Sequence, residues 1–469
     1  MKKIKIGMIS LGCAKNQVDA EVMLAMLDAA GYELTNDAKK ADIIIINTCG
    51  FIDDAKQEAI DTIIETGKLK EKKLKGIIVS GCLAQRYGKQ IVQTLPEVNA
   101  VVGAYDFGNI VEAVEAVLKQ EHIVRGTGLA KTKLKRPNGD IYYFSDNVDL
   151  SLDYLDFGRI LTTPKSYAYL KVAEGCSNRC TYCAIPGIRG PFRSRTIDSL
   201  RTEALDLAAS GIKEIVVVAQ DTTMYGTDIS ADGKSMLPEL IGMLDGIDEI
   251  QRVRLLYLYP DEVTDEILNA IKNSKKTLHY FDIPLQHIND RVLKRMNRRG
   301  NGAMYRKVIA DFRAAMPDCV IRTSLITGFP GETNEEYLEM LDFLKETKLD
   351  RVGIFIYSKE EGTPAAKLPD QVPMTVKKRR YNELMRTQQA ISYGKNIQRI
   401  GKVYDVIVDS FSNDGLFYKG RSYMEAPEED GTIYFAAHDE LSAGDIVKVK
   451  ILQAEEYDLT GEQIVAKID

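Results

Sequence analysis

Two blocks of this 469-residue chain alternate short apolar runs with amphipathic stretches, and that alternation restricts the folds it can adopt. In the first block a stretch of helical periodicity follows each apolar run. Such alternation favours a parallel, doubly wound α/β sheet with helices on both faces. The apolar runs of the first block are 4–10, 41–47, 75–80 and 98–103.

The second block repeats the alternation on a larger scale, with helical stretches between most of its apolar runs. Six units of this kind predict a full or partial parallel β/α barrel. A long polar helix is expected next, at roughly 374–399. The candidate strands are 167–172, 214–218, 253–259, 279–283, 320–326 and 352–357.

The segments outside the two blocks differ in character from them. Residues 131–165 are polar and irregular, and predict a linker with one hairpin at 137–140. The C-terminal segment has five short β-like runs, which predict a small β-barrel of the OB type. The expected parts are an α/β domain over 1–130, the linker over 131–165, the β/α barrel over 166–395 and the small β-barrel over 396–469.

Composition limits the possible environments of the protein. The net charge of −6 argues mildly against a dedicated nucleic-acid binder. No stretch has the apolar length of a membrane helix, and the N-terminal run MKKIKIGMISLGC lacks the features of a signal peptide. We therefore expect a cytoplasmic protein that does not bind membranes. Thiols stay reduced there, so patterned cysteines indicate metal binding or catalysis rather than disulfides.

Three of the seven cysteines, Cys176, Cys180 and Cys183, form a C-x3-C-x2-C motif. A structural zinc site would need a fourth cysteine or histidine nearby, but there is no second C-x2-C and the four histidines are scattered. A 4Fe–4S cluster held by three cysteines would leave one iron open to a small molecule. A zinc knuckle and a plain electron-transfer cluster remain as alternatives.

A second set of cysteines, Cys13, Cys49 and Cys82, lies in the first block, and each member follows an apolar run closely. The ends of parallel strands lie along one edge of a sheet, where open α/β sheets bind ligands. A single cysteine would usually be a small core residue. Three at equivalent strand ends, with glycine or threonine beside each, predict a second three-cysteine cluster. Cys319 has no such partners and is expected in the core.

Polar and turn-forming residues follow several barrel strands, at the end where such barrels place their active sites. Glycine and proline at these positions often only form a turn. Two arginines near the cysteine motif can pair with a carboxylate of a cofactor or substrate, or simply belong to a surface loop. The candidates are Gln220, Asp221, Pro284, Gln286, His287, Gly328, Pro330, Gly331, Arg193 and Arg195.

The C-x3-C-x2-C motif after a first barrel strand, with Tyr182 before its last cysteine, resembles the radical S-adenosylmethionine (SAM) superfamily. The resemblance implies that SAM chelates the open iron through its amino and carboxylate groups and is reduced to a 5′-deoxyadenosyl radical. The stretch SLITGFPGET resembles the adenine-side segment of the superfamily, with Ser324 replacing the first glycine. The implied SAM contacts are Tyr182, Gln220, Asp221, Gln286, Gly328 and Pro330.

Both cysteine sets together, followed by a small β-barrel, resemble the methylthiotransferases over essentially the whole chain. In that family the terminal barrel is a TRAM domain. The resemblance implies two 4Fe–4S clusters, with SAM as methyl donor and radical source and sulfide or persulfide as sulfur source. It also implies transfer of CH3S to an unactivated C–H carbon, a reaction that requires cofactor chemistry.

Four stretches resemble the RimO-type branch, which modifies the β-carbon of an aspartate on small-subunit ribosomal protein twelve. The departures, Ala14, Gln17 and Gly187, touch no cysteine. The resemblance also implies an electron donor such as flavodoxin or ferredoxin, and nothing in the sequence demands an oligomer. The stretches are SLGCAKNQVDAE, NTCGFIDDAKQE, AEGCSNRCTYCAIPGIRGPFRSR and GRSYMEAPEEDGTIYF.

The charge of the terminal segment favours a protein substrate. Residues 401–469 hold 15 acidic and 6 basic residues, a net charge of −9. Such a surface would repel RNA phosphates but attract a basic ribosomal protein or an assembled 30S subunit, although acidity can also serve only solubility. The alternatives are a tRNA adenosine methylthiotransferase (MiaB type) and a non-enzymatic iron–sulfur sensor.

Overall fold

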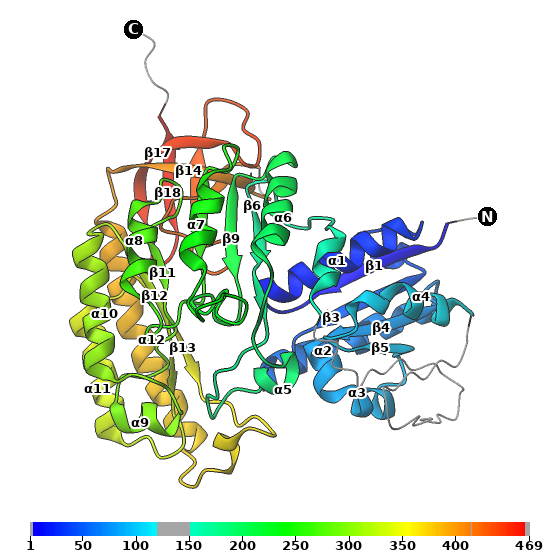
Figure 1. The fold of residues 1–469 in the computed structure, drawn as a ribbon, viewed down its shortest axis with the longest axis horizontal. Helices are drawn as coiled ribbons and strands as arrows, with labels where there is room; N and C mark the ends of the chain where they lie inside the picture. Colours follow the sequence, from blue (N-terminus) through cyan, green and yellow to red (C-terminus); the bar gives the residue numbers. More distant parts are fainter. Residues whose placement is uncertain (1–2, 120–150, 414, 465–469) are drawn as a thin grey trace.

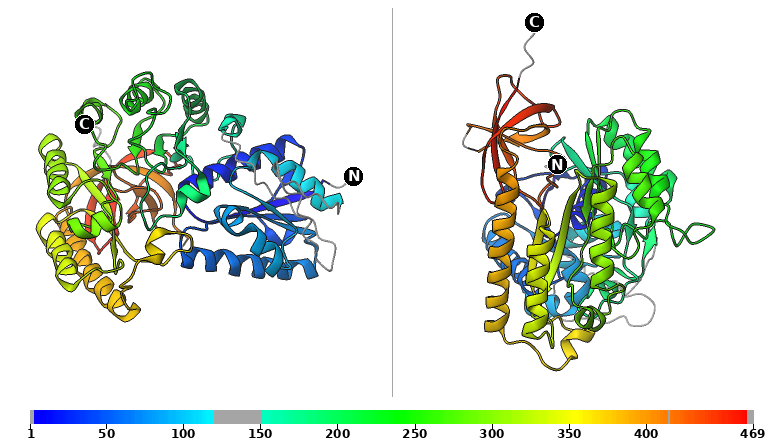
Figure 2. Two further views of the ribbon diagram at one scale, coloured as in Figure 1. Left: turned by 60° about the horizontal axis from the view of Figure 1, so that its bottom comes forward. Right: turned by 90° about the vertical axis from the view of Figure 1, so that its left-hand side faces the viewer.

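The computed structural model describes residues 3–119, 151–413 and 415–464, which form three adjoining bodies (Figure 1). The N-terminal body and the central one lie side by side, and the C-terminal body caps one end of the central one (Figures 1 and 2). The hairpin expected at 137–140 lies outside the described residues. No helix among the described residues is both long enough and apolar enough to span a membrane.

The N-terminal body is a five-stranded parallel sheet of order β2-β1-β3-β4-β5, which confirms the doubly wound α/β prediction. Ile43 and Ile45 of β3 pack with helices α1 and α4, whereas Ile44 and Ile46 pack with α2 and α3 on the other face. The elements are β1 Lys5–Ser10, α1 Ala14–Ala29, β2 Glu33–Leu34, β3 Ile43–Thr48, α2 Asp53–Gly67, β4 Gly76–Gly81, α3 Cys82–Thr94, β5 Ala100–Val102 and α4 Ile110–Lys119.

The central body holds two three-stranded parallel sheets, β10-β9-β6 and β11-β12-β13, which together make an open β/α barrel. The prediction of a partial barrel is therefore confirmed. Strand β10 is shorter than expected because Tyr257, two residues after its end, adopts a left-handed φ of 61° that a strand cannot continue. The strands are β6 Tyr167–Lys171, β9 Glu214–Val218, β10 Arg252–Leu255, β11 Tyr280–Asp282, β12 Val320–Thr327 and β13 Arg351–Ile356.

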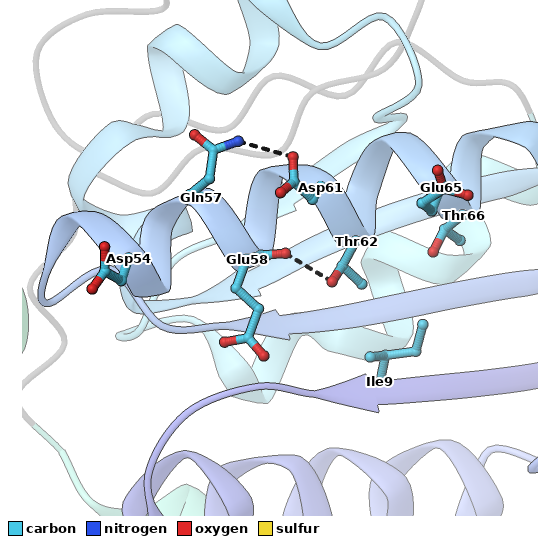
Figure 3. Close-up of a pocket in the computed structure, with 8 residues that line it drawn as sticks. All are labelled: Ile9, Asp54, Gln57, Glu58, Asp61, Thr62, Glu65 and Thr66. Atoms are coloured by element: carbon cyan, nitrogen blue, oxygen red, sulfur yellow. Dashed lines mark hydrogen bonds between the residues drawn. The ribbon is translucent and has the colours of Figure 1, made fainter.

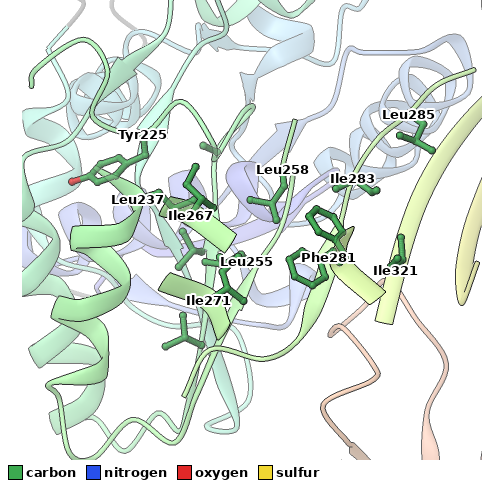
Figure 4. Close-up of a cluster of buried hydrophobic side chains, with 14 of the residues drawn as sticks. Tyr225, Leu237, Leu255, Leu258, Ile267, Ile271, Phe281, Ile283, Leu285 and Ile321 are labelled. Atoms are coloured by element: carbon green, nitrogen blue, oxygen red, sulfur yellow. The ribbon is translucent and has the colours of Figure 1, made fainter. Parts of the chain in front are cut away.

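Helices cover the outer face of the barrel and bury one continuous core between themselves and the strands (Figure 4). Alternation along each strand supplies that core, as where Leu170 of β6 faces the helices and its neighbours face inward. A short pair, β7 Ala173–Glu174 and β8 Arg193–Ser194, flanks the cysteine motif. The helices are α5 Ile185–Arg189, α6 Ile197–Ala209, α7 Leu237–Asp245, α8 Asp265–Asn273, α9 Asp290–Arg295, α10 Gly302–Ala315, α11 Asn334–Thr347 and α12 Met374–Ile397.

The inner face of the barrel is closed by other parts of the chain. Tyr167 and Tyr169 of β6 share a hydrophobic cluster with Val18 and Val22 of α1, so the N-terminal body covers this face near β6. Ala426, from the C-terminal body, belongs to the same cluster. The three bodies therefore meet at the inner face of the barrel.

The C-terminal body is a closed five-stranded barrel of order β14-β15-β16-β18-β17, as the turn-separated β-like runs predict. It contacts the barrel strands at their N-terminal ends. Glu214, the first residue of β9, is fully buried between Arg254 Nε at 2.7 Å and Arg421 Nη1 at 2.8 Å. The strands are β14 Val403–Phe411, β15 Tyr418–Arg421, β16 Ile433–Ala436, β17 Ile446–Ala454 and β18 Leu459–Gln463.

Replacing Glu214 by glutamine should weaken the attachment of the C-terminal barrel. The change keeps the volume but leaves two buried guanidinium groups without their shared carboxylate, which costs about 3 kcal/mol. Thermal unfolding and limited proteolysis of the full chain should show a lower Tm and earlier release of the C-terminal barrel. Lys448→Ala is the control, because its ion pair with Asp405 is exposed and contributes about 0 to 1 kcal/mol. Equal Tm values for the two variants would contradict the role of Glu214.

Candidate functional site

Cys13, Cys49 and Cys82 follow the carboxyl ends of β1, β3 and β4, which are neighbours in the sheet. Cys13 is the N-cap residue of α1, and Cys82 is the first residue of α3. The parallel topology therefore gathers the three cysteines at one edge, as their positions after apolar strands predict. Cys13 is exposed, whereas Cys82 is buried.

Hydrogen bonds join the first turn of α1 to the end of β3 at that edge. Asn16 Nδ2 donates to the carbonyl of Thr48 at 3.0 Å, and Asn47 Nδ2 donates to the carbonyl of Asn16 at 2.7 Å. Only glycine fits at position 81, where φ is +88° and a Cβ would lie 2.4 Å from Asn47 Oδ1. The asparagines and the glycine beside these cysteines thus allow the cysteine-bearing segments to approach closely.

The thiols of this set interact electrostatically, and none of them forms a disulfide. Burial raises the pKa of Cys82 to about 11, although the guanidinium of Arg189 acts in the opposite direction. Burial also raises the pKa of Cys49. These thiols are therefore protonated at neutral pH, and binding a metal here would release protons.

The second set lies on the loop that follows β7, at the carboxyl end of the barrel. The amide of Cys183 donates to the carbonyl of Cys180 at 3.1 Å, and the Tyr259 hydroxyl lies 3.1 Å from Cys180 Sγ. Arg298 stacks 3.8 Å above the Tyr259 ring. Burial raises the pKa of Cys183 to about 12 and that of Cys176 to about 11.

Arg189 connects the two sets of cysteines. It ends α5, six residues after Cys183, and its Nε donates to Cys82 Sγ at 3.2 Å. Its Nη1 donates to Asp19 at 2.8 Å and to Glu174 at 2.9 Å. The side chain is almost inaccessible to solvent, so the two cysteine-bearing loops meet across a dry, charged contact.

The donor sets fit iron–sulfur clusters better than single ions. In the described part of the chain, no three His, Cys, Asp or Glu side chains are arranged to hold one metal ion. A cubane cluster binds each cysteine through a different iron, so its ligands lie farther apart than those of one ion. Two sets of three free thiols, each gathered on one loop or one edge, supply the ligand type that iron–sulfur clusters take.

The structure brings Gln220 and Asp221 to the three-cysteine loop of the barrel. Gln220 Nε2 donates to Glu174 Oε1 at 2.8 Å. Asp221 Oδ2 accepts from Asn178 Nδ2, between Cys176 and Cys180, at 2.7 Å. Both side chains therefore lie at the three-cysteine loop of the barrel.

Gln286 and Gly328 lie at neighbouring strand ends in different settings. Gln286 has φ of 71° and links β11 to β12, because its amide donates to the carbonyl of Ser324 at 2.8 Å. A positive φ in a non-glycine residue stores strain of the kind found at functional sites. The Gly328 amide donates to the carboxylate of Glu332, and Pro330 is buried in the same turn. The hydrogen bond from Gly328 to Glu332 therefore stabilises this turn without a bound ligand.

The remaining candidates differ in whether they form ion pairs. Arg195 forms ion pairs with Glu203 and Asp156, so its charge has a structural role. Arg193 has no carboxylate partner among the described residues and donates to the carbonyl of Arg189 at 3.0 Å. Tyr182 packs beside the cluster that contains Phe329, on the side of the SLITGFPGET segment.

Sequence reasoning missed several groups at this site. Arg189 and Lys15 stand inside the motif stretches, yet nothing in the spacing shows that they meet residues of another domain. Tyr257 and Tyr259 come from LYLYP, where a longer strand was expected. The proline at the end of LYLYP was the signal that could have identified them, because proline disfavours continuation of a regular strand.

A separate hollow of about 730 Å³ runs along α2 and reaches Ile9 of β1 (Figure 3). Its wall carries exposed carboxylates of α2, including Asp54, Glu58 and Asp61. Its lining includes none of the six cysteines. We therefore give it no part in the chemistry of the site.

Comparisons with known proteins agree with this arrangement of domains. The description "Uncharacterized protein family UPF0004" matches residues 5–103, "Radical SAM superfamily" matches 170–344 and "TRAM domain" matches 400–464. Among solved structures, the radical SAM methyltransferase TsrM from Kitasatospora setae has a TM-score of 0.52 at 12% identity. The match covers 78% of this chain and 77% of TsrM, and it shows a shared fold.

The fold and the three-cysteine loop define a radical SAM protein with an added N-terminal α/β domain and a TRAM barrel. The chain is 45% identical to the ribosomal protein uS12 methylthiotransferase RimO of Acetivibrio thermocellus, over 99% of each chain. It is 47% identical to that of a Thermoanaerobacter species, over 97% of this chain and 99% of the relative. The chain belongs to the RimO family of ribosomal protein uS12 methylthiotransferases.

His287, a sequence candidate, is fully buried, and burial lowers its pKa to about 3. The unfolded chain therefore binds a proton between about pH 6.5 and pH 3 that the folded chain does not. Acidification from pH 7 to 5.5 should cost about 1 kcal/mol of stability through this residue. His287→Gln should show a smaller fall in Tm between these pH values than the parent chain. An equal fall would exclude a buried neutral imidazole.

Proposed function

We propose that this protein transfers a CH3S group to the β-carbon of an aspartate on ribosomal protein uS12. The observation that carries the proposal is the buried contact between the two cysteine-bearing loops, in which Arg189, six residues after Cys183, donates to Cys82. Membership of the RimO family supports the same reaction. The tRNA-modifying alternative is not favoured by these relatives.

We assign Cys176, Cys180 and Cys183 to the cluster that binds SAM, and Cys13, Cys49 and Cys82 to an auxiliary cluster. When bound, the clusters and SAM would supply the one-electron chemistry that activates an unreactive C–H bond. They would also supply the methyl group and the sulfur. Of the candidate SAM contacts, Gln220 and Asp221 have the best support, because both lie at the cysteine loop of the barrel.

The candidates Tyr182, Gln286, Gly328 and Pro330 stay in the proposal with different roles. Tyr182 and Gln286 are half-buried and are candidates for direct contact. The amide of Gly328 is already engaged by Glu332, so its turn would contribute shape rather than a hydrogen bond. These roles follow from which polar atoms remain available for hydrogen bonds to SAM.

The chain's own residues prepare the two loops for this task. Tyr259 places its hydroxyl 3.1 Å from Cys180 Sγ, and Arg298 places a cation over the same ring. Hydrogen bonds and positive charge near a ligating sulfur stabilise the reduced form of a cluster. Arg189 does the same at Cys82 and also holds the two domains in register.

We infer that the substrate is a basic partner, uS12 alone or within the 30S subunit, and that the reaction takes place in the cytoplasm. The net charge of −9 over residues 401–469 supports a basic protein at the C-terminal barrel rather than an RNA backbone. The proposal includes a flavodoxin or ferredoxin as electron donor, sulfide or persulfide as sulfur source, and a monomeric enzyme.

A competition experiment tests the substrate. The reconstituted protein receives a reductant, sulfide and methyl-labelled SAM together with bulk tRNA and 30S subunits, without oxygen. We expect label as CH3S on an aspartate of uS12, located by mass spectrometry. Label on a tRNA base would show that tRNA, and not uS12, is the substrate. No label and no 5′-deoxyadenosine would indicate a non-enzymatic sensor instead.

Single cysteine replacements separate the two clusters. Cys180→Ala should abolish both 5′-deoxyadenosine and product, because it removes a ligand of the SAM-binding cluster. Cys49→Ala should keep SAM cleavage and lose CH3S transfer, with about half of the iron lost. Cys319→Ala is the matched control, since this cysteine packs against the barrel core away from both sets. Normal CH3S transfer by Cys49→Ala would refute the assignment of the auxiliary cluster.

A further inference from the structure

Lys15 is a buried cation that meets no carboxylate of the described residues at ion-pair distance. It is the second residue of α1, two positions after Cys13, and only 7% of it is exposed. Its Nζ lies 3.4 Å from the centre of the Tyr257 ring and 3.5 Å from the carbonyl oxygen of Ala219. An ammonium group has three donors, and buried charges are normally paired.

The surroundings of Lys15 belong to the active edge of the barrel. Ala219 directly follows β9, and Tyr257 lies just beyond the end of β10. Lys15 therefore reaches from the Cys13 loop to the barrel edge that carries the other cysteine set. Two residues beyond Tyr257, Tyr259 contacts Cys180, so one short segment touches both Lys15 and the SAM-binding loop.

Tyr257 is held in a strained position against Lys15. Its φ is 61°, which is costly for an aromatic residue. Its amide donates to Asp282 Oδ2 at 3.0 Å, and its carbonyl accepts from the amide of Thr222 at 3.0 Å. These bonds fix the ring under the ammonium group, so the cation is positioned rather than free to turn away.

The nearby carboxylate that could neutralise Lys15 is committed elsewhere. Glu429 of the C-terminal barrel acts on Lys15 electrostatically, yet it forms its ion pair with Arg322. Cys13, beside Lys15 in sequence, is exposed. Lys15 therefore presents an oriented ammonium group beside the Cys13 loop, with no carboxylate of the described residues at ion-pair distance.

We infer that Lys15 binds the side-chain carboxylate of the target aspartate and so selects an acidic residue for modification. The inference rests on the proposed function. In aspartate the carboxylate is bonded directly to the β-carbon that receives CH3S, so its binder must stand near the sulfur-carrying cluster. Lys15 follows Cys13, a ligand of that proposed cluster, whereas the SAM-binding loop has its own cation in Arg298.

The test measures binding of recombinant uS12 to the reconstituted full-length protein. Wild type is compared with Lys15→Met, Lys15→Arg and the control Lys89→Met, which removes an exposed lysine of α3. Each is offered uS12 and a uS12 variant with asparagine at the modified position. Loss of a charged hydrogen bond predicts about 10- to 100-fold weaker binding of uS12 to Lys15→Met.

The test compares how strongly each variant prefers the aspartate form of uS12 over the asparagine form. Wild type should prefer the aspartate form, Lys15→Met should bind both forms equally, and Lys15→Arg should recover part of the preference. Iron content and SAM affinity of Lys15→Met should match wild type, which separates this role from misfolding. Weakened SAM affinity, or an aspartate preference that survives in Lys15→Met, would overturn the inference. If wild type does not modify uS12 at all, the proposed function itself fails.

Discussion

A buried network of two cations and two carboxylates holds the two cysteine-bearing domains together. Asp19 comes from α1 of the N-terminal sheet, and Lys171, Glu174 and Arg189 come from the barrel. Burial alone would raise the pKa of Glu174, but Arg189 and Lys171 outweigh it and hold that pKa well below its usual range. Such a network contributes orientation more than net stability, because desolvation offsets most of its Coulomb energy. The network fixes the relative position (the register) of the two cysteine-bearing loops.

That register determines the rest of the site. Because the guanidinium of Arg189 is shared by Asp19, Glu174 and the sulfur of Cys82, a rotation between domains would break several bonds at once. A second contact limits the same motion, since Glu360 of the barrel domain accepts from Arg86 at 2.8 Å and from Lys56 at 2.9 Å. The two cysteine-bearing domains are therefore held in one relative orientation.

The sequence predicts the layered architecture well, since strand and helix periods are local properties. It also predicts that Cys13, Cys49 and Cys82 gather, because parallel strands place their ends on one edge. The break at Tyr257 was not predicted, since a left-handed residue leaves the apolar pattern intact. The partners of Arg189 and Gly328 were not predicted either, because they lie far away in sequence or depend on side-chain direction. Ligand assignment by family resemblance remains a prediction for the six cysteines.

The C-terminal barrel stands at the opposite end of the β/α barrel from the cysteines, attached where the strands begin. The eight residues of β12 span about 26 Å along the barrel. The connection between β15 and β16 nevertheless returns along the inner face, where Glu428 accepts from the hydroxyls of Tyr167 and Tyr169 and Glu429 acts on Lys15. The C-terminal body is therefore part of the inner wall of the barrel as well as a cap on its end. Displacing it would remove two carboxylates from that wall, so its attachment and the charge beside the Cys13 loop are coupled.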